Sequence, residues 1–236
     1  MKKILIIILL LILPLAGCYD YSEPDEKAWV LAIGVDKAKQ NLLTVTMIIA
    51  IPKNIAGGSG GEPGGGGGNK TFLPVSMEVD TLLGGLEVLD AVVDRRPDLA
   101  HIKWFVFSRE LAETGIEQYF APLARFYQFR RSSNMVICKG RADQFLSQGE
   151  PELEDNVGKY YELLQRGWRF SEFVPFDTLH QFYLKSKTPG VAAVATLAAL
   201  EREDPVYPDA SPKPKGEYRA GEMPRKGGGK IELMGG

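Results

Sequence analysis

Apolar and polar positions along the chain predict strands and helices that alternate within one domain. Residues 29–36 and 42–51 are rich in Val, Ile and Thr and flank the polar stretch 37–41, a pattern that indicates a two-stranded hairpin. Short apolar runs at residues 104–107 and 135–138 predict two further buried strands.

Apolar residues also recur at spacings of three and four, as on one face of an amphipathic helix. These segments lie at residues 79–93, 116–126, 142–146, 153–168 and 176–187. The first should end near Arg95 and Arg96, ahead of Pro97, and Pro175 suits the first turn of the last. Together the elements predict an α/β (α+β) domain over residues 24–200, with a mixed β-sheet flanked by helices.

Two glycine- and proline-rich stretches interrupt this pattern. Residues 57–68 read GGSGGEPGGGGG and predict a flexible surface loop, since no side chain there can be buried. A phosphate-binding loop would need a strand before it, a helix after it and a Lys-Ser or Lys-Thr pair at its end, whereas Lys70-Thr71 leads into a proline-containing segment. Residues 201–236 carry five prolines and predict a linker, in which residues 231–234 resemble the start of a strand without a partner.

The amino terminus has the order of a lipoprotein signal peptide. Lys2 and Lys3 precede an unbroken apolar run over residues 4–13, and Leu15-Ala16-Gly17-Cys18 follows. A run of ten residues rises only about 15 Å as a helix, roughly half the hydrocarbon thickness of a bilayer, so it favours a removable signal over a membrane span.

Cys18 is the predicted site of lipidation, as an N-palmitoyl and S-diacylglycerol cysteine. Small residues before it suit a peptidase cleft, and two or more acyl chains give stable membrane attachment where one is marginal. The alternative is an ordinary secretory signal followed by a chance cysteine. The predicted organisation is a signal peptide over 1–17, a lipidated tether over 18–23, the domain over 24–200 and the linker over 201–236.

Composition limits the functions open to this chain. Removal of the signal leaves 219 of 236 residues, and the formal charge of −2 becomes −4 without Lys2 and Lys3. No basic stretch is dense enough to predict nucleic-acid binding. With Cys18 acylated, Cys138 is the remaining cysteine, so neither an intramolecular disulfide nor a four-cysteine metal site is expected.

The residues capable of chemistry are scattered. His101 and His180 are the two histidines, and neither has ligands at metal-binding spacing beside it. We expect His101 to be half-buried and bonded to local backbone, the alternative being a pH-responsive partner contact. Cys138 should be a packed free thiol, and Asp36 should belong to a turn at a strand end or accept a hydrogen bond from a ligand.

The Gly-x-Ser-x-Gly surround of a hydrolase is missing at serines 108, 132, 133, 147, 171 and 186. We predict no catalytic, metal or cofactor-binding residue. Arg125, Arg130 and Arg131 form a basic run that either meets acidic partner residues or phospholipid headgroups, or is simply solvated. These arginines and His101 are the candidate partner contacts.

Several segments, in order along the chain, resemble the lipoprotein C subunit of nutrient germinant receptors in endospore-forming bacteria. After the cysteine motif, VLAIGVD at residues 30–36 is similar to the first strand of that family. HIK at 101–103 and SRELAETGI at 108–116 resemble its next conserved stretch, and VICKGRA at 136–142 is similar to its strand ending in a Gly-x-Ala turn.

The resemblance implies a non-enzymatic subunit anchored by lipid on the outer face of the spore inner membrane. It further implies assembly with an integral-membrane B subunit and a partly membrane-embedded A subunit. Two features depart from the family: its members continue into further carboxy-terminal domains where this chain stops at Gly236, and residues 57–68 form a longer glycine-rich stretch. The competing functions are a substrate-binding lipoprotein of an importer, which usually needs two larger lobes, and an envelope hydrolase.

Overall fold

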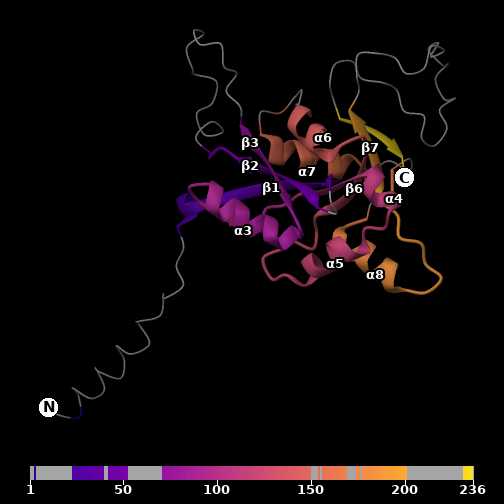
Figure 1. Ribbon diagram of the computed structural model, residues 1–236, viewed down its shortest axis with the longest axis horizontal. Helices are drawn as coiled ribbons and strands as arrows, with labels where there is room; N and C mark the ends of the chain where they lie inside the picture. The colour runs from indigo at the N-terminus through magenta and orange to yellow at the C-terminus, as the bar shows by residue number, and fades with distance from the viewer. Residues whose placement is uncertain are drawn as a thin grey trace, which may run out of the picture.

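The computed structural model describes most of the predicted domain (Figure 1). The described residues are 3, 23–39, 42–52, 71–149, 154, 156–168, 174–175, 177–200 and 231–235. The predicted signal peptide apart from Lys3, the lipidation site Cys18, the glycine-rich stretch 57–68 and the linker over 201–230 lie outside the described residues.

The strands in this part of the chain form one mixed sheet. They are β1 (Lys27–Lys37), β2 (Leu43–Ala50), β3 (Phe72–Val79), β4 (Arg96–Asp98), β5 (Trp104–Ser108), β6 (Asn134–Lys139), β7 (Thr196–Leu200) and β8 (Ile231–Gly235). The helices are the 3-10 turn η2 (Pro24–Glu26), α3 (Leu82–Val92), α4 (Arg109–Glu113), α5 (Glu117–Arg125), α6 (Ala142–Gln148), α7 (Val157–Trp168) and α8 (Leu179–Lys187).

The sheet has the strand order β3-β2-β1-β5-β6-β7-β8, and β4 pairs separately with β1. Its centre is parallel, because β1, β5, β6 and β7 run in the same direction. Antiparallel strands flank the centre, with β2 and β3 on one side and β8 on the other. The predicted hairpin of the first two strands and the predicted mixed sheet are both confirmed.

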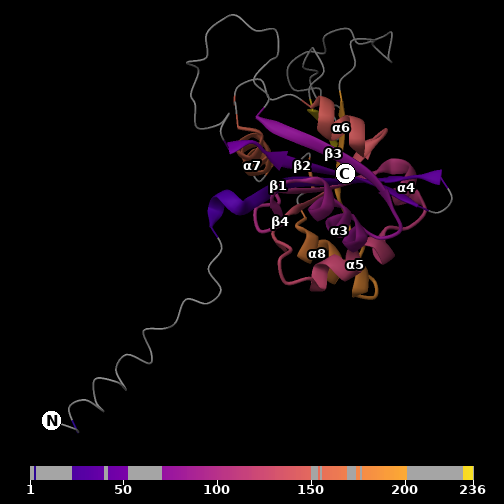
Figure 2. The ribbon, with the colours of Figure 1, turned by 60° about the vertical axis from the view of Figure 1, so that its left-hand side comes forward.

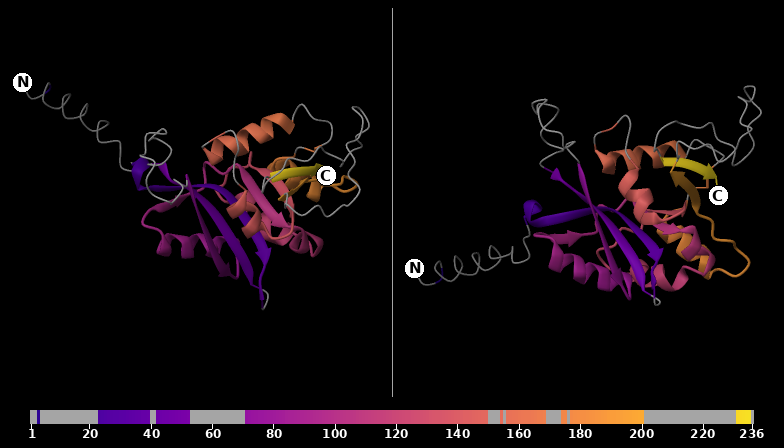
Figure 3. Two further views of the ribbon diagram at one scale, coloured as in Figure 1. Left: turned by 90° about the horizontal axis from the view of Figure 1, so that it is seen from above. Right: turned by 45° about the horizontal axis from the view of Figure 1, so that its top comes forward.

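Helices cover both faces of the sheet (Figures 1 and 2). The face under α3, α5 and α8 buries a core that includes Phe105, Phe107 and Phe120. On the opposite face, α6 and α7 close over Trp104, whose ring stacks on that of Tyr161 at a centroid distance of 4.4 Å. The two views in Figure 3 show the same three layers from above and obliquely. The domain is therefore a three-layer α/β sandwich, and each face has its own apolar core.

Two helices begin later than the apolar spacing predicts, because polar side chains cap them. Val79 ends β3 instead of opening a helix, and α3 starts at Leu82 because Thr81 accepts a hydrogen bond from the Gly84 N–H at 3.0 Å. Likewise Pro175 lies outside α8. That helix starts at Leu179, after a capping box between Thr178 and Gln181.

The prediction that residues 231–234 lack a strand partner is wrong. β8 pairs antiparallel with β7, joining Ile231 to Leu200 and Leu233 to Ala198. The strand β7 itself is not predicted by the pattern, because its sequence, TLAAL, has alanines where most strands carry β-branched residues. Pairing in the sheet decides its conformation instead.

Candidate functional site

The parallel strands β5 and β6 are neighbours in the sheet, and the chain leaves them toward opposite faces. The chain leaves β5 into α4 and α5, which cover one face, and it leaves β6 into α6, which covers the other. In open α/β sheets, ligands commonly bind in the crevice at the carboxyl ends of such strands. A ligand site in this fold is therefore expected at this edge.

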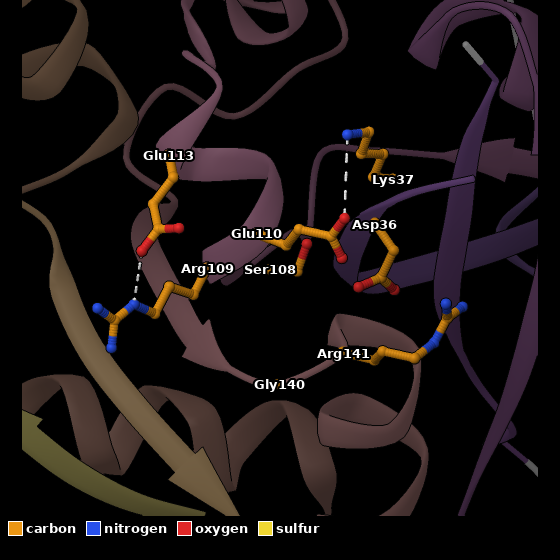
Figure 4. Close-up of a pocket in the computed structure, with 8 residues that line it drawn as sticks. All are labelled: Asp36, Lys37, Ser108, Arg109, Glu110, Glu113, Gly140 and Arg141. Atoms are coloured by element: carbon orange, nitrogen blue, oxygen red, sulfur yellow. Dashed lines mark hydrogen bonds and ion pairs between the residues drawn. The ribbon is translucent and has the colours of Figure 1, made fainter. Parts of the chain in front are cut away.

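A hollow of about 290 Å³ lies at this edge (Figure 4). Its lining comes from the ends of β1 and β5, from α4, and from the turn between β6 and α6. The lining residues are Asp36, Lys37, Ser108, Arg109, Glu110, Glu113, Gly140 and Arg141.

The cations around the hollow are matched by carboxylates of the same chain. Arg109 Nε lies 2.9 Å from Glu113 Oε1, and Lys37 Nζ lies 3.9 Å from Glu110 Oε1. Arg141 makes a two-pronged contact with Asp143, outside the lining, at 2.8–3.1 Å. The hollow therefore presents a balanced set of charges, not a field of one sign that would attract a charged ligand.

Asp36 fills the place where an anion would otherwise bind. Its side chain is 1% exposed, and its two carboxylate oxygens accept hydrogen bonds from the backbone N–H groups of Ala142 at 2.7 Å and Asp143 at 2.9 Å. The residue at the cap position of α6 itself, Arg141, makes no side-chain capping bond. Asp36 is thus neither part of a local turn nor a free ligand contact, but the cap of a helix 106 positions away.

Burial shifts the pKa of two groups at this edge of the sheet, Asp36 in the lining of the hollow and Cys138 near the end of β6. It raises the pKa of the Asp36 carboxyl above 3.8, although the two backbone hydrogen bonds act in the opposite direction. It also raises the pKa of the Cys138 thiol far above its usual range. That thiol is buried, unpaired with another cysteine, and 3.5 Å from the Gly140 carbonyl oxygen. The predicted packed free thiol is confirmed.

The hydroxyl in the hollow has a structural partner as well. Ser108 is 3% exposed, and its Oγ accepts a hydrogen bond from the Leu111 N–H at 3.4 Å, so it caps α4. Within the described residues, no group of three or more His, Cys, Asp or Glu side chains is placed to hold a metal ion. Ser108 and Asp36 thus position the starts of α4 and α6, the helices that follow β5 and β6.

The predicted contact residues lie elsewhere. Arg125 ends α5, and Arg130 and Arg131 occupy the turn before β6; all three are exposed. His101 is exposed, not half-buried, and its ring lies 5.6 Å from that of Trp29. The structure therefore groups the three arginines and puts the histidine on a separate turn, ahead of β5.

The capping role of Asp36 escapes sequence inspection, yet the sequence holds a signal for it. A helix that starts at Ala142 lacks Ser, Thr, Asp or Asn at position 141, so its amide groups require a partner from elsewhere. A buried acid at the end of a strand is a candidate for that partner. Choosing Asp36 over other acids requires the strand order, which only the structure supplies.

Comparison with known proteins identifies the family to which this fold belongs. The sequence profile of the family described as the spore germination protein N-terminal domain matches residues 20–200. The chain belongs to this germination protein family. The match spans the helices on both faces and all strands except β8, and it confirms the resemblance seen in the sequence.

Two relatives of this germination domain come from Bacillus subtilis (strain 168). Spore germination protein KC is 30% identical over 135 residues, which cover 56% of this chain and 32% of that protein. The putative spore germination protein YfkR is 27% identical over 142 residues, covering 59% of this chain and 36% of the relative. The matched part thus spans about a third of each relative.

No solved structure matches the germination domain. Within the described residues, no helix is both long enough and apolar enough to cross a bilayer.

Proposed function

We propose that this chain is a membrane-anchored lipoprotein subunit of a nutrient germinant receptor and acts in endospore germination by assembling with integral-membrane A and B subunits. Its place is the outer face of the spore inner membrane, held by lipid on Cys18. The observation that carries the proposal is the family match over residues 20–200. The names of both relatives, which refer to spore germination, agree with it.

The geometry supports a binding and assembly role over catalysis. At the edge of the sheet where α/β proteins commonly hold ligands, Asp36 occupies the start of α6 and Ser108 caps α4. The basic residues around them form ion pairs with carboxylates of the same chain. We therefore propose that the subunit acts through contacts made by its outer surface and catalyses no reaction.

The test is a comparison of spores carrying Cys18→Ala with wild-type spores. We expect the variant to be lost from the inner-membrane fraction on immunoblots and to slow nutrient germination. Germination by a stimulus that bypasses nutrient receptors should be unchanged.

Cys138→Ala is the matched control, because it removes the other cysteine, which is buried in the sheet. Spores with this variant should keep the protein in the inner membrane. A protein found only in growing-cell membranes, with germination unaffected by Cys18→Ala, contradicts the receptor role while leaving the anchor intact.

A further inference from the structure

The helices α5 and α8 pack side by side on one face of the sheet (Figures 1 and 2). The Phe120 ring lies 5.3 Å from that of Phe182 and 6.2 Å from that of Tyr183. The turn after α5 joins the same surface, because the Arg131 carbonyl accepts a hydrogen bond from the His180 N–H at 3.2 Å. We call residues 118–134 and 178–195 the α5–α8 surface.

This surface is free of acids in a chain that has 30 Asp and Glu residues. Neither of its two segments contains an acidic residue, whereas Arg125, Arg130 and Arg131 are exposed on it. The neighbouring acids are already paired with its lysines: Glu117 with Lys187, and the buried Asp177 with Lys185 at 2.7 Å.

Within the described residues, no acidic side chain forms an ion pair with the three arginines. Arg130 Nε donates to the neutral Ser132 hydroxyl at 2.8 Å. Tyr127, between them in sequence, is 85% exposed, and Leu184 on α8 is 50% exposed. A basic surface that also shows an aromatic and an aliphatic side chain suits the headgroup region of a bilayer.

The chain enters the domain at the same edge of the sheet as these arginines. β1 begins at Lys27, and β6 begins at Asn134, directly after the turn that holds Arg130 and Arg131. Both strands run parallel to β5, so their amino ends lie at one edge. From Glu23 back to Cys18 the chain can span at most about 18 Å, so a lipid on Cys18 keeps this edge close to the bilayer.

The point of entry carries exposed charges of both signs. Glu23, Asp25 and Glu26 precede β1, and Arg95 and Arg96 lie beside them, since Arg96 pairs in register with Lys27. The α5–α8 surface has no acids of its own, so an anionic membrane attracts it more strongly than it attracts the entry point.

We propose that the α5–α8 surface rests on the bilayer and that Arg125, Arg130 and Arg131 bind the phosphates of anionic phospholipid headgroups. The orientation rests on the proposed lipid anchor at Cys18, since the tether brings this edge to the membrane. Arginine suits the role because its planar guanidinium donates two parallel hydrogen bonds to a phosphate.

The test uses the lipidated chain in vesicles of phosphatidylcholine with or without phosphatidylglycerol, plus a lipid with a nitroxide on its headgroup. A fluorophore is placed at Tyr127→Cys or, on the opposite face, at Leu163→Cys in α7, each in a Cys138→Ala background. We expect strong quenching at position 127, dependent on phosphatidylglycerol and weakened by salt, and little quenching at position 163.

Reversing the charge of the three arginines distinguishes their contribution from a general attraction of the domain to the membrane. Arg125→Glu, Arg130→Glu and Arg131→Glu together should abolish most quenching at position 127 while the lipid keeps the protein on the vesicles. The matched control reverses Lys37, Lys39 and Lys139, exposed residues at the opposite edge of the parallel strands, and should leave quenching intact.

Each other outcome overturns the proposal in a different way. Equal quenching at both positions, or no effect of the arginine reversal, refutes the orientation while the anchor stands. Unchanged quenching combined with loss of co-isolated receptor subunits would assign the arginines to an acidic protein partner instead. A chain that stays in the supernatant when vesicles are sedimented refutes the anchor itself, and with it the orientation.

Discussion

The Asp36 carboxylate accepts a hydrogen bond from the backbone N–H of Ala142 at 2.7 Å and thereby ties the end of β1 to the start of α6. A second bond, from the Asp143 N–H at 2.9 Å, uses the other carboxylate oxygen. Both amide groups would be unsatisfied at the helix start without it. One side chain therefore fixes the position of α6 against the sheet.

Replacement of Asp36 by alanine should lower the free energy of unfolding by about 2–3 kcal/mol, because it removes a helix cap and leaves amide groups without an acceptor. Urea denaturation measures the effect. Glu110→Ala is the matched control in the same hollow. The Glu110 side chain is 74% exposed, so its loss should change stability by less than about 0.5 kcal/mol. Equal losses in the two variants would contradict the capping role.

The contribution of Asp36 should also depend on pH. Because burial raises its pKa in the folded state above 3.8, the folded protein binds more protons at this site than the unfolded chain. The stability that wild type gains over Asp36→Asn should therefore fall as the pH rises from 3.8 through the folded-state pKa. Paired denaturation curves across this range check the sign, and a rising difference would contradict it.

Wild type must be compared with Asp36→Asn because other carboxylates change the pH dependence of stability in the opposite direction. Lys27 lies beside Asp98 and lowers the pKa of its carboxyl, and Lys103 does the same for Glu162. These groups make the chain as a whole more stable as the pH rises above their pKa values. Only the difference between wild type and Asp36→Asn isolates the buried acid.

The sequence predicts the central strands because they are buried on both faces. In β1, the run from Val30 to Val35 is apolar without alternation, as expected for a parallel strand between two helical layers. Caps are harder to predict, since Thr81 and Thr178 shift helix starts that apolar spacing alone puts earlier. Local side-chain hydrogen bonds decide these boundaries.

Contacts between distant segments are beyond sequence inspection for a different reason. Asp36 meets Ala142, and β8 meets β7, only after the strand order has been set. The grouping of Arg131 with His180 likewise needs α8 to fold back along α5. In each case the local sequence indicates a polar group or strand that needs a partner, but the order of the strands and helices decides which partner lies beside it.

Gly34 allows α6 to approach β1 closely. A Cβ atom at this position would lie 2.9 Å from Leu146 Cδ1 and 3.2 Å from Ala142 Cβ. We expect Gly34→Ala to lower stability by about 1–3 kcal/mol, the usual cost of overpacking a core. Gly167→Ala in α7 is the control, since it meets nothing within 4 Å and should stabilise the helix by up to about 1 kcal/mol. Thermal unfolding of both variants tests this, and a neutral Gly34→Ala would mean that α6 can move outward without loss.

Cys138 should resist alkylation in the folded protein, because its thiol is buried and its raised pKa disfavours the reactive thiolate. Maleimide labelling followed by mass spectrometry should show little reaction in buffer and complete reaction in denaturant.

The same experiment also tests the lipid anchor, because an acylated Cys18 has no free thiol. Denatured mature protein from membranes should then take up one label in wild type and none in Cys138→Ala. A second label in wild type would show that Cys18 is free, and rapid labelling of the native protein would show that β6 opens far more readily than its burial implies.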